Sequence, residues 1–380
     1  MSLYCKFYKE KKQVSYDNGI TFIDVTPAEY RKGELIERDS PDCGYVPPTP
    51  PASGQPFTVV AHNEDTEFQL NAGHDDPFDV YYSSDGVNWT HIYTDDIFIP
   101  IPAGTKKYFK VDSSFSGRTW FYIGNGDFDV EGNIMSLGNL NFESATTIPS
   151  SNYYAGLFSG NTHLISAENL VLPSTTLSNY CYANMFSGCT SLTSAPALPA
   201  TTLAQGCYSN MFYGCTSLTT APSVLPAMIA TDNCYDCMFF DCTSLTSAPE
   251  LPATTVGAEC YFGMFGRCRS LTTAPSILPA TNLNGATYCY SQMFNGCSGL
   301  TTAPELPATT LSNGCYEWIF RNCSSLNYIK CLATNISAND CTYGWVDGVA
   351  SSGTFVKASN MSSWTRGVDG IPSGWTIQNA

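Results

Sequence analysis

Residues 207–218 read C-Y-S-N-M-F-Y-G-C-T-S-L, and this block recurs along the second half of the chain as C-Y-x-x-M-F-x-x-C-x-x-L. The period of the repeat is 26 to 29 residues, and the last copy has Ile319 in place of methionine. The six copies begin at Cys181, Cys207, Cys234, Cys260, Cys289 and Cys315. A repeat of this length is typical of a solenoid, in which one supersecondary unit stacks on the next.

The spacing inside each copy predicts a short α-helix. Cys207, Met211, Cys215 and Leu218 stand at i, i+4, i+8 and i+11, positions that fall on one face of a helix. The first five copies continue with L-T-[ST]-A-P, and in four of them the next stretch ends in L-P-A-T, the second copy ending in L-P-A-M. A proline cannot donate to a β-ladder, so we expect any strand here to be only a few residues long. The predicted fold class is therefore α+β and β-rich, with a short strand, a turn and a short helix in each repeat.

The pattern M-F-x-x-C-x-x-L-T-x-x-P at this period resembles the BspA-like class of leucine-rich repeats, which occur in surface proteins of gut and oral Bacteroidetes. The resemblance covers roughly residues 135–345. It implies a leucine-rich-repeat solenoid that binds varied targets, and it implies no shared catalytic residues.

Composition and turn signals divide the chain into five parts. The division comprises an N-terminal anchor or docking segment (1–44), a Pro-rich linker (45–56), a β-sandwich-like domain (57–135), the repeat solenoid (136–345) and a C-terminal cap (346–380). Two stretches, 15–22 and 83–89, resemble the Asp-box of sialidase propellers, in which the motif braces a hairpin and does no chemistry. We expect both to be hairpin turns.

The chain is acidic, with a formal net charge of −16. Residues 1–150 hold 22 Asp and Glu against 11 Lys and Arg, whereas residues 151–330 hold eight against four. A nucleic-acid-binding protein would present a basic stripe, so we do not expect nucleic acid as a partner. No stretch is apolar enough to predict membrane insertion, and the first residues lack the apolar core of a signal peptide.

The 17 cysteines have two interpretations. Disulfides between equivalent positions of adjacent repeats are one, but the regular spacing favours small, buried, reduced side chains. Cys237 lies off the pattern and is the best candidate for an exposed thiol. The pair Cys234 and Cys237 is the only C-x-x-C, so a zinc site is disfavoured.

We expect neither a metal nor a cofactor. A calcium loop at His74, Asp75, Asp76 and Asp79 is less favoured than a solvated acidic loop, because the EF-hand spacing is absent. The sequence has no recognisable nucleophile motif and four histidines. The carboxylates Asp127, Asp129 and Glu131 alternate as on the exposed face of a strand. We therefore expect a protein that is not an enzyme, with a carbohydrate-active enzyme in residues 57–135 as an alternative.

Positions that vary between copies indicate a binding surface. They carry residue types that are enriched at interface hot spots. The candidate binding residues are Tyr213, Phe240, Arg267, Arg269, Trp318 and Arg321.

The sequence favours a non-enzymatic adhesion protein, and the missing export signal favours a bacteriophage virion fibre or decoration protein. Its expected partners are a host cell-surface glycan or protein and, through residues 1–44, other virion proteins. Such a fibre would be on the virion surface and could be a homotrimer. The alternative is a BspA-like adhesin on the bacterial cell surface.

Overall fold

The computed structural model describes residues 4–8, 11–15, 23–25, 54–71, 78–94, 96–112, 120–138, 141–148, 150–362 and 364–380. The chain forms two compact units, Met1–Thr49 and Pro50–Ala380. The division between them falls inside the predicted Pro-rich linker. In the first unit, three strands form an antiparallel sheet in the order β1-β2-β3, namely Tyr4–Tyr8, Lys11–Ser15 and Ile23–Val25. Strands β2 and β3, on either side of the hairpin predicted at 15–22, pair antiparallel, and residues 16–22 lie outside the described part.

The second unit begins with two β-sheets. The larger sheet has the order β12-β11-β4-β9-β6-β7, with β13 also paired to β11, and the smaller has the order β10-β5-β8. Their strands are β4 (Phe57–Ala61), β5 (Thr66–Asn71), β6 (Phe78–Ser83), β7 (Thr90–Thr94), β8 (Asp96–Ile101), β9 (Lys106–Asp112), β10 (Trp120–Ile123) and β11 (Phe128–Asn133). Buried rings join the two sheets, since Phe68 of β5 stacks on Phe109 of β9 with centroids 4.1 Å apart.

A separate β-sandwich over residues 57–135 is not what the structure shows, because the larger sheet runs on into the solenoid. Strand β11 pairs in parallel with β12 (Leu164–Ser166) and β13 (Leu170–Val171). Two short 3-10 helices, η1 (Ile134–Leu137) and η2 (Phe142–Ser144), follow β11. Phe57 of β4 also stacks on Phe158, so both parts share one core.

The second predicted hairpin is confirmed. Strands β6 and β7 pair antiparallel, and the turn between them is held by Asp85. Its Oδ1 accepts from the amides of Val87 and Asn88 at 2.9 and 2.7 Å, and its Oδ2 accepts from the Asn88 side chain at 2.7 Å. The Asn88 amide, then the Asn88 side chain and the Val87 amide, hold the pKa of the Asp85 carboxyl well below its ordinary value. The motif here is a structural brace.

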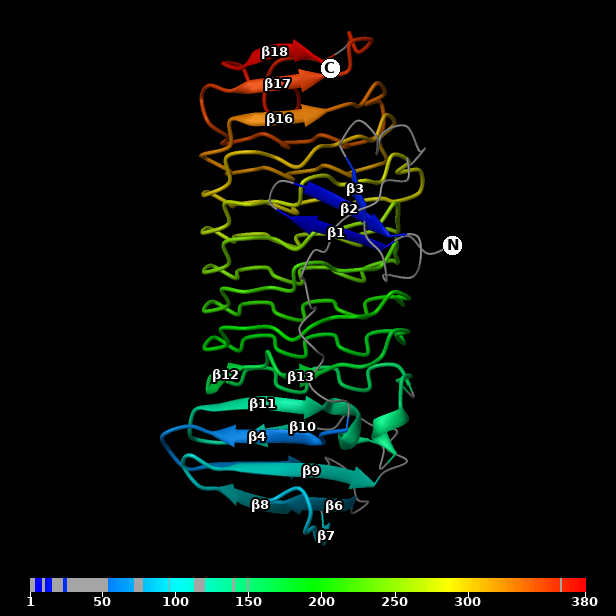
Figure 1. Cartoon of the computed structure of the whole chain (residues 1–380). Helices are drawn as coiled ribbons and strands as arrows, with labels where there is room; N and C mark the ends of the chain where they lie inside the picture. The colour runs from blue at the N-terminus through cyan, green and yellow to red at the C-terminus, as the bar shows by residue number, and fades with distance from the viewer. Residues whose placement is uncertain are drawn as a thin grey trace. The chain divides into compact units, whose positions relative to one another are not determined.

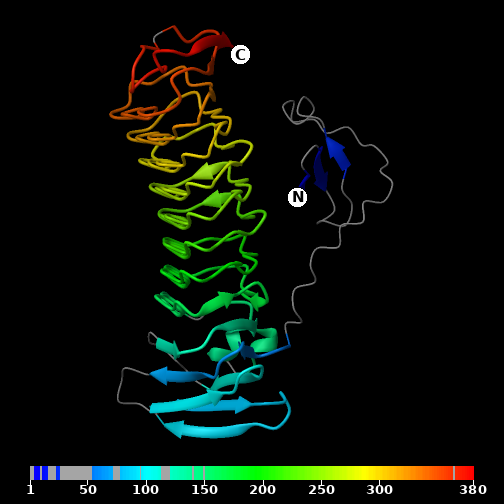
Figure 2. The same cartoon turned by 90° about the vertical axis from the view of Figure 1, so that its left-hand side faces the viewer.

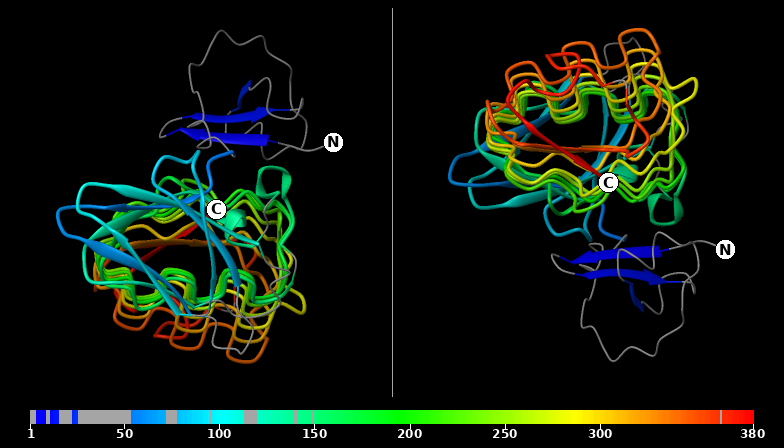
Figure 3. Two further views of the ribbon diagram at one scale, coloured as in Figure 1. Left: turned by 90° about the horizontal axis from the view of Figure 1, so that it is seen from below. Right: turned by 90° about the horizontal axis from the view of Figure 1, so that it is seen from above.

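The repeats form a β-solenoid whose circuits of chain, called coils below, stack in order of sequence (Figures 1 and 2). Seen along the stacking direction, successive coils overlie one another (Figure 3). Parallel bridges between equivalent residues of neighbouring coils fix this register, as in Ser166 to Ser194 and Ser194 to Thr220. The named strands within the stack are short: β14 (Ile229–Ala230), β15 (Thr255–Val256) and β16 (Tyr328–Cys331).

The predicted helix in each repeat is wrong, and residues 150–362, all of which are described, contain none. A ribbon of linked β-turns takes its place. In the second copy, Cys207, Met211 and Cys215 donate their amides three residues back within the coil. Ser209 and Tyr213 do the same, and the alternate amides donate to the next coil instead, as Tyr208 does to Cys234 at 3.0 Å and Phe212 to Met238 at 2.9 Å. An α-helix would satisfy every such amide four residues back in the same segment.

The turn ribbon repeats every four residues, which explains why it imitates a helical stripe. Three residues per coil, four apart, have positive φ; in the second copy they are Gly206, Asn210 and Gly214. The left-handed region favours glycine and tolerates asparagine, and both are poor helix formers. Equivalent positive-φ residues form three columns along the solenoid: the first holds Asn152, Tyr180, Gly206, Asn233, Glu259, Tyr288, Gly314 and Asp340; the second holds Gly156, Asn184, Asn210, Cys237, Gly263, Gln292, Trp318 and Gly344; the third holds Gly160, Gly188, Gly214, Asp241, Arg267, Gly296, Asn322 and Gly348.

The interior is built from ladders of identical side chains. One tyrosine per coil stacks on the next with ring centroids 5.4 to 6.0 Å apart, from Tyr154 to Tyr316. A parallel ladder of phenylalanines runs from Phe158 to Phe320 with spacings of 5.3 to 5.9 Å. Stacked rings at these separations attract one another beyond their buried area.

The cysteines from Cys181 to Cys341 are free thiols that fill the space beside these rings. They are buried except Cys237, which is partly exposed as predicted. The second cysteine of a copy donates its S–H to the phenylalanine carbonyl of the preceding coil, as Cys215 does to Phe186 at 3.1 Å. The same contact, at 3.0 to 3.1 Å, is made by Cys189, Cys242, Cys268, Cys297 and Cys323.

The C-terminal segment continues the stack and closes its core. Strand β17 (Thr354–Lys357) pairs in parallel with β16, and β18 (Thr376–Asn379) with β17. Trp345 ends both aromatic ladders, and Trp364 stacks on it at 5.3 Å while Phe355 meets it edge-on. The predicted cap is thus made of two further strands and a tryptophan pair.

Substitution of Asn210 distinguishes the turn ribbon from a helix. Asn210→Ala should lower the free energy of unfolding by about 1 kcal/mol, because alanine tolerates the left-handed region poorly. Asn210→Gly, which puts a glycine in that region, should be close to neutral. In a helix, alanine would be the most favourable residue at this position. Urea unfolding followed by circular dichroism measures the difference, and a stabilised Asn210→Ala would refute the ribbon.

Substitution of Cys215 tests the thiol ladder. Cys215→Ser should lower the free energy of unfolding by about 1 to 2 kcal/mol, because a buried hydroxyl costs more to desolvate than a thiol and fills less space. Cys237→Ser, at the partly exposed thiol, is the matched control and should change stability by less than about 0.5 kcal/mol. Equal denaturation midpoints for parent and both variants would contradict the buried ladder.

Candidate binding surface

The six residues predicted to bind lie along the turn ribbons of neighbouring coils. We call Tyr213, Phe240, Arg267, Arg269, Trp318 and Arg321 the arginine–aromatic strip. Each occupies a position where the ribbon faces solvent, and none is fully buried. Ring and guanidinium contacts join five of these residues into two groups of stacked side chains, and Arg269 lines a depression between the groups.

The first group contains Tyr213, Phe240 and Arg267, on three successive coils. The rings of Tyr213 and Phe240 are nearly parallel, with centroids 5.3 Å apart, and the Arg267 guanidinium lies 5.3 Å from the centre of the Phe240 ring. The Phe240 ring fits here because residue 266 is glycine. A Cβ added to Gly266 would be only 2.6 Å from that ring. Tyr213 is 40% exposed, so the group presents an aromatic surface ending in a positive charge.

The second group contains Trp318 and Arg321. The Arg321 guanidinium lies 5.3 Å from the centre of the Trp318 ring, and its Nε is 3.4 Å from Oδ2 of Asp347. Trp318 has a φ of 52° and covers Gly344 of the next coil, where a Cβ would be 2.6 Å from the ring. Beyond it, Tyr343 is 50% exposed and its ring is 6.0 Å from that of Trp318.

The depression between the groups is lined by three arginines and by polar residues of the intervening coils. These are Arg267, Arg269, Asn295, Gly296, Ser298, Arg321 and Asn322. Asn295, Gly296 and Asn322 occupy variable positions of the repeat, so the sequence carried a signal for them. Ser298 gave no such signal, because serine is common throughout the repeats.

The described cysteines offer no activated thiolate. Burial raises the pKa of the Cys189 and Cys323 thiols to about 12, and the same effect raises the pKa of Cys237 above its ordinary value, helped by the Asp236 carboxylate. A cysteine nucleophile requires the opposite shift.

The carboxylates of β11 contact basic side chains. Oδ2 of Asp129 lies 3.0 Å from Nε2 of His62, and Oε1 of Glu131 lies 3.2 Å from Nζ of Lys106. The side chains of Asp129 and Glu131 are about one-third exposed, and that of Asp127 is more exposed. They therefore line the solvent face of a strand, as their alternation predicted.

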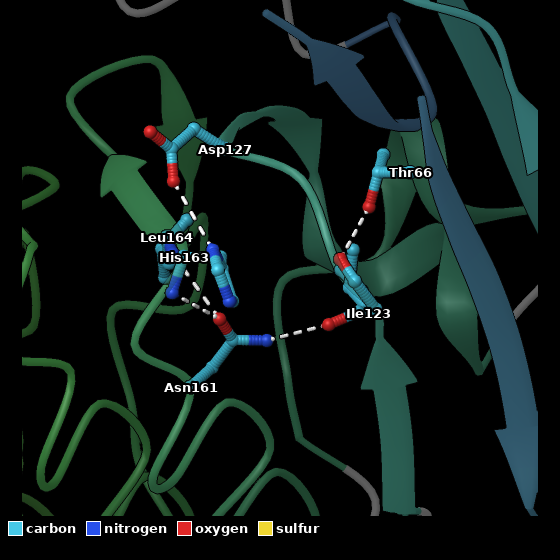
Figure 4. Close-up of polar contacts among 7 residues, drawn as sticks. Thr66, Ile123, Asp127, Asn161, His163 and Leu164 are labelled. Atoms are coloured by element: carbon cyan, nitrogen blue, oxygen red, sulfur yellow. Dashed lines mark hydrogen bonds and ion pairs between the residues drawn. The ribbon is translucent and has the colours of Figure 1, made fainter. Parts of the chain in front are cut away.

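Asp127 takes part in the junction between the sheet and the first coil (Figure 4). Its Oδ1 lies 3.2 Å from Nδ1 of His163. Asn161 accepts from the amides of His163 and Leu164 and donates to the carbonyl of Ile123 at 2.9 Å. These contacts tie β10 and β11 to the solenoid, which gives Asp127 a structural role.

Among the residues that the structure describes, no group of histidine, cysteine and carboxylate side chains is arranged to hold a metal. Of the acidic loop considered for calcium, His74, Asp75 and Asp76 lie outside the described residues. The described part of the chain also has no helix of the length and apolar character that a membrane span requires.

Comparisons with protein-family models, with curated proteins and with solved structures gave no match.

Proposed function

We propose that this protein is a non-enzymatic recognition protein that binds its target through the arginine–aromatic strip. The observation that carries the proposal is the concentration of exposed aromatic rings and arginines along neighbouring coils of a solenoid whose interior barely varies. Solenoids offer an ordered surface on which side chains can vary without cost to the core. Tryptophan, tyrosine and arginine are the residues enriched at binding hot spots.

We further propose a bacteriophage fibre or decoration protein that contacts a glycan or protein on a bacterial surface. Residues 1–44 would then dock it to other virion proteins, and assembly as a trimer would give avidity. The repeat motif supports a distant relationship with BspA-like proteins, although the coils lack the helix expected of a leucine-rich repeat. The alternative of a carbohydrate-active enzyme in residues 57–135 gains no support from Asp127, Asp129 and Glu131, whose carboxylates contact His163, His62 and Lys106 respectively.

Binding to cells tests the strip. Fluorescently labelled full chain should bind saturably to Bacteroidetes cells or to mucin. The variant Tyr213→Ser with Trp318→Gly should bind at least about tenfold more weakly, because two hot-spot side chains are removed. Ser187 and Gly344 stand at the equivalent positions of other coils, so the fold should persist.

The matched control is Tyr288→Gly, which removes another exposed aromatic ring from the solenoid, outside the strip. Its binding should equal that of the parent. Absence of parental binding, or equal binding by all three proteins, would refute recognition through the strip.

Mass spectrometry of purified phage particles and, separately, of the envelope fraction of the source culture tests the location. A virion protein should be present in particles at a symmetric copy number. Peptides confined to the envelope fraction would replace the virion proposal with the bacterial adhesin.

A further inference from the structure

The basic residues of the repeat region are gathered at one place. Residues 151–330 contain four, namely Arg267, Arg269, Arg321 and Lys330. The three arginines all line the depression between the two halves of the strip. In a chain with a net charge of −16, a local group of three guanidinium groups creates a field opposite in sign to the rest of the molecule.

The lining of the depression suits an anion. No carboxylate is among the described residues that line it, whereas Asn295, Ser298 and Asn322 supply polar groups between the arginines. Gly296 lies beside Arg267 and adds no side chain there. A Cβ added to Gly296 would be 3.6 Å from Cα and from Cγ of Arg267. Arginine is the side chain best suited to planar, bidentate contacts with carboxylate and with the oxygens of sulfate or phosphate.

Two of these arginines depart from what the repeat uses elsewhere. Arg267 has a φ of 61° in the column that otherwise holds glycine, asparagine or aspartate. Long side chains have positive φ in the other two columns, as at Tyr180 and Gln292, whereas among the described residues of this column Arg267 alone has one. Arg269 stands where the first three copies have Thr190, Thr216 and Thr243.

Stacking holds the guanidinium groups on either side of the depression. Phe240 supports Arg267, while Trp318 and Asp347 support Arg321. Side chains held in this way lose less freedom on binding, which favours affinity. The exposed rings of Tyr213 and Tyr343 extend the surface at either end. Exposed aromatic rings on either side of a cationic depression fit a ligand that combines several rings with an anionic substituent.

We propose that the depression binds an acidic saccharide, with Arg267, Arg269 and Arg321 contacting its sulfate ester or carboxylate and the exposed rings of Tyr213 and Tyr343 packing against sugar units on either side. This inference rests on the proposed role of the strip in recognition and specifies the ligand class. A nucleic acid is the weaker match, because a long polyanion would be repelled by the acidic remainder of the protein.

The test is isothermal titration calorimetry of the full chain with four probes: a chondroitin sulfate hexasaccharide, a hyaluronan hexasaccharide, maltohexaose and oligodeoxythymidine. The two acidic sugars separate sulfate from carboxylate recognition. The variant Arg267→Gly with Arg269→Thr restores residues that the repeat itself uses. Its thermal midpoint should equal or exceed that of the parent, so a loss of binding cannot come from misfolding. The control Lys106→Gln with Lys107→Gln removes the same charge from β9.

The parent should bind at least one acidic hexasaccharide and bind maltohexaose at least tenfold more weakly. The arginine double variant should lose at least tenfold in affinity, the lysine control should stay within twofold, and added salt should weaken binding. Equal affinity for maltohexaose, or unchanged binding by the arginine variant, would overturn the acidic-saccharide site. Preference for oligodeoxythymidine would also overturn it. If the parent protein binds cells but none of the saccharides, the acidic-saccharide site is refuted and the recognition function is kept. If it binds neither cells nor saccharides, the recognition function itself is refuted.

Discussion

The structure depends on the alternation of hydrogen bonds in the turn ribbon. Every second amide bonds within its coil, and the amides between them bond to the next coil, as Tyr208 does to Cys234. This arrangement fixes the register between coils, so equivalent residues must lie directly above one another. Each interior position therefore becomes a column, and a column is stable when its side chains stack well on copies of themselves. Tyrosine and phenylalanine rings 5.3 to 6.0 Å apart satisfy that requirement.

The cysteine content follows from the same constraint. Beside the stacked rings, the space in each coil admits only a small side chain. The phenylalanine carbonyl of the preceding coil lies next to this space, and a weak hydrogen-bond donor is sufficient there. A thiol fills this space, and its S–H reaches that carbonyl at 3.0 to 3.1 Å. It also costs less to bury than a hydroxyl. A high count of cysteines is thus a packing feature here, unrelated to disulfides or to metal binding in the described residues.

The sequence was sufficient to predict the solenoid, its buried residues, the hairpin at Asp85 and the position of the strip. The prediction of a helix was wrong because the two structures have similar periods. A turn of four residues and a helical turn of 3.6 residues both place Cys207, Met211 and Cys215 on one face over so short a stretch. The distinguishing signal was present in Gly206, Asn210 and Gly214, which suit positive φ and not a helix. The depression could not be predicted, because it depends on the lateral direction of each side chain, which differs between a turn ribbon and the expected helix.

A core of identical columns also changes how exceptions are interpreted. Because the interior sets nearly every buried position, variation is confined to the surface, where each residue can be compared with its column. Arg267 has positive φ in a column that otherwise holds glycine, asparagine or aspartate, and Trp318 has positive φ in another column. Tyr180, Glu259, Tyr288 and Gln292 do so as well, so the turn ribbon accommodates large side chains at these positions. What sets Arg267 and Trp318 apart is that each stacks with another member of the strip, Phe240 and Arg321 respectively.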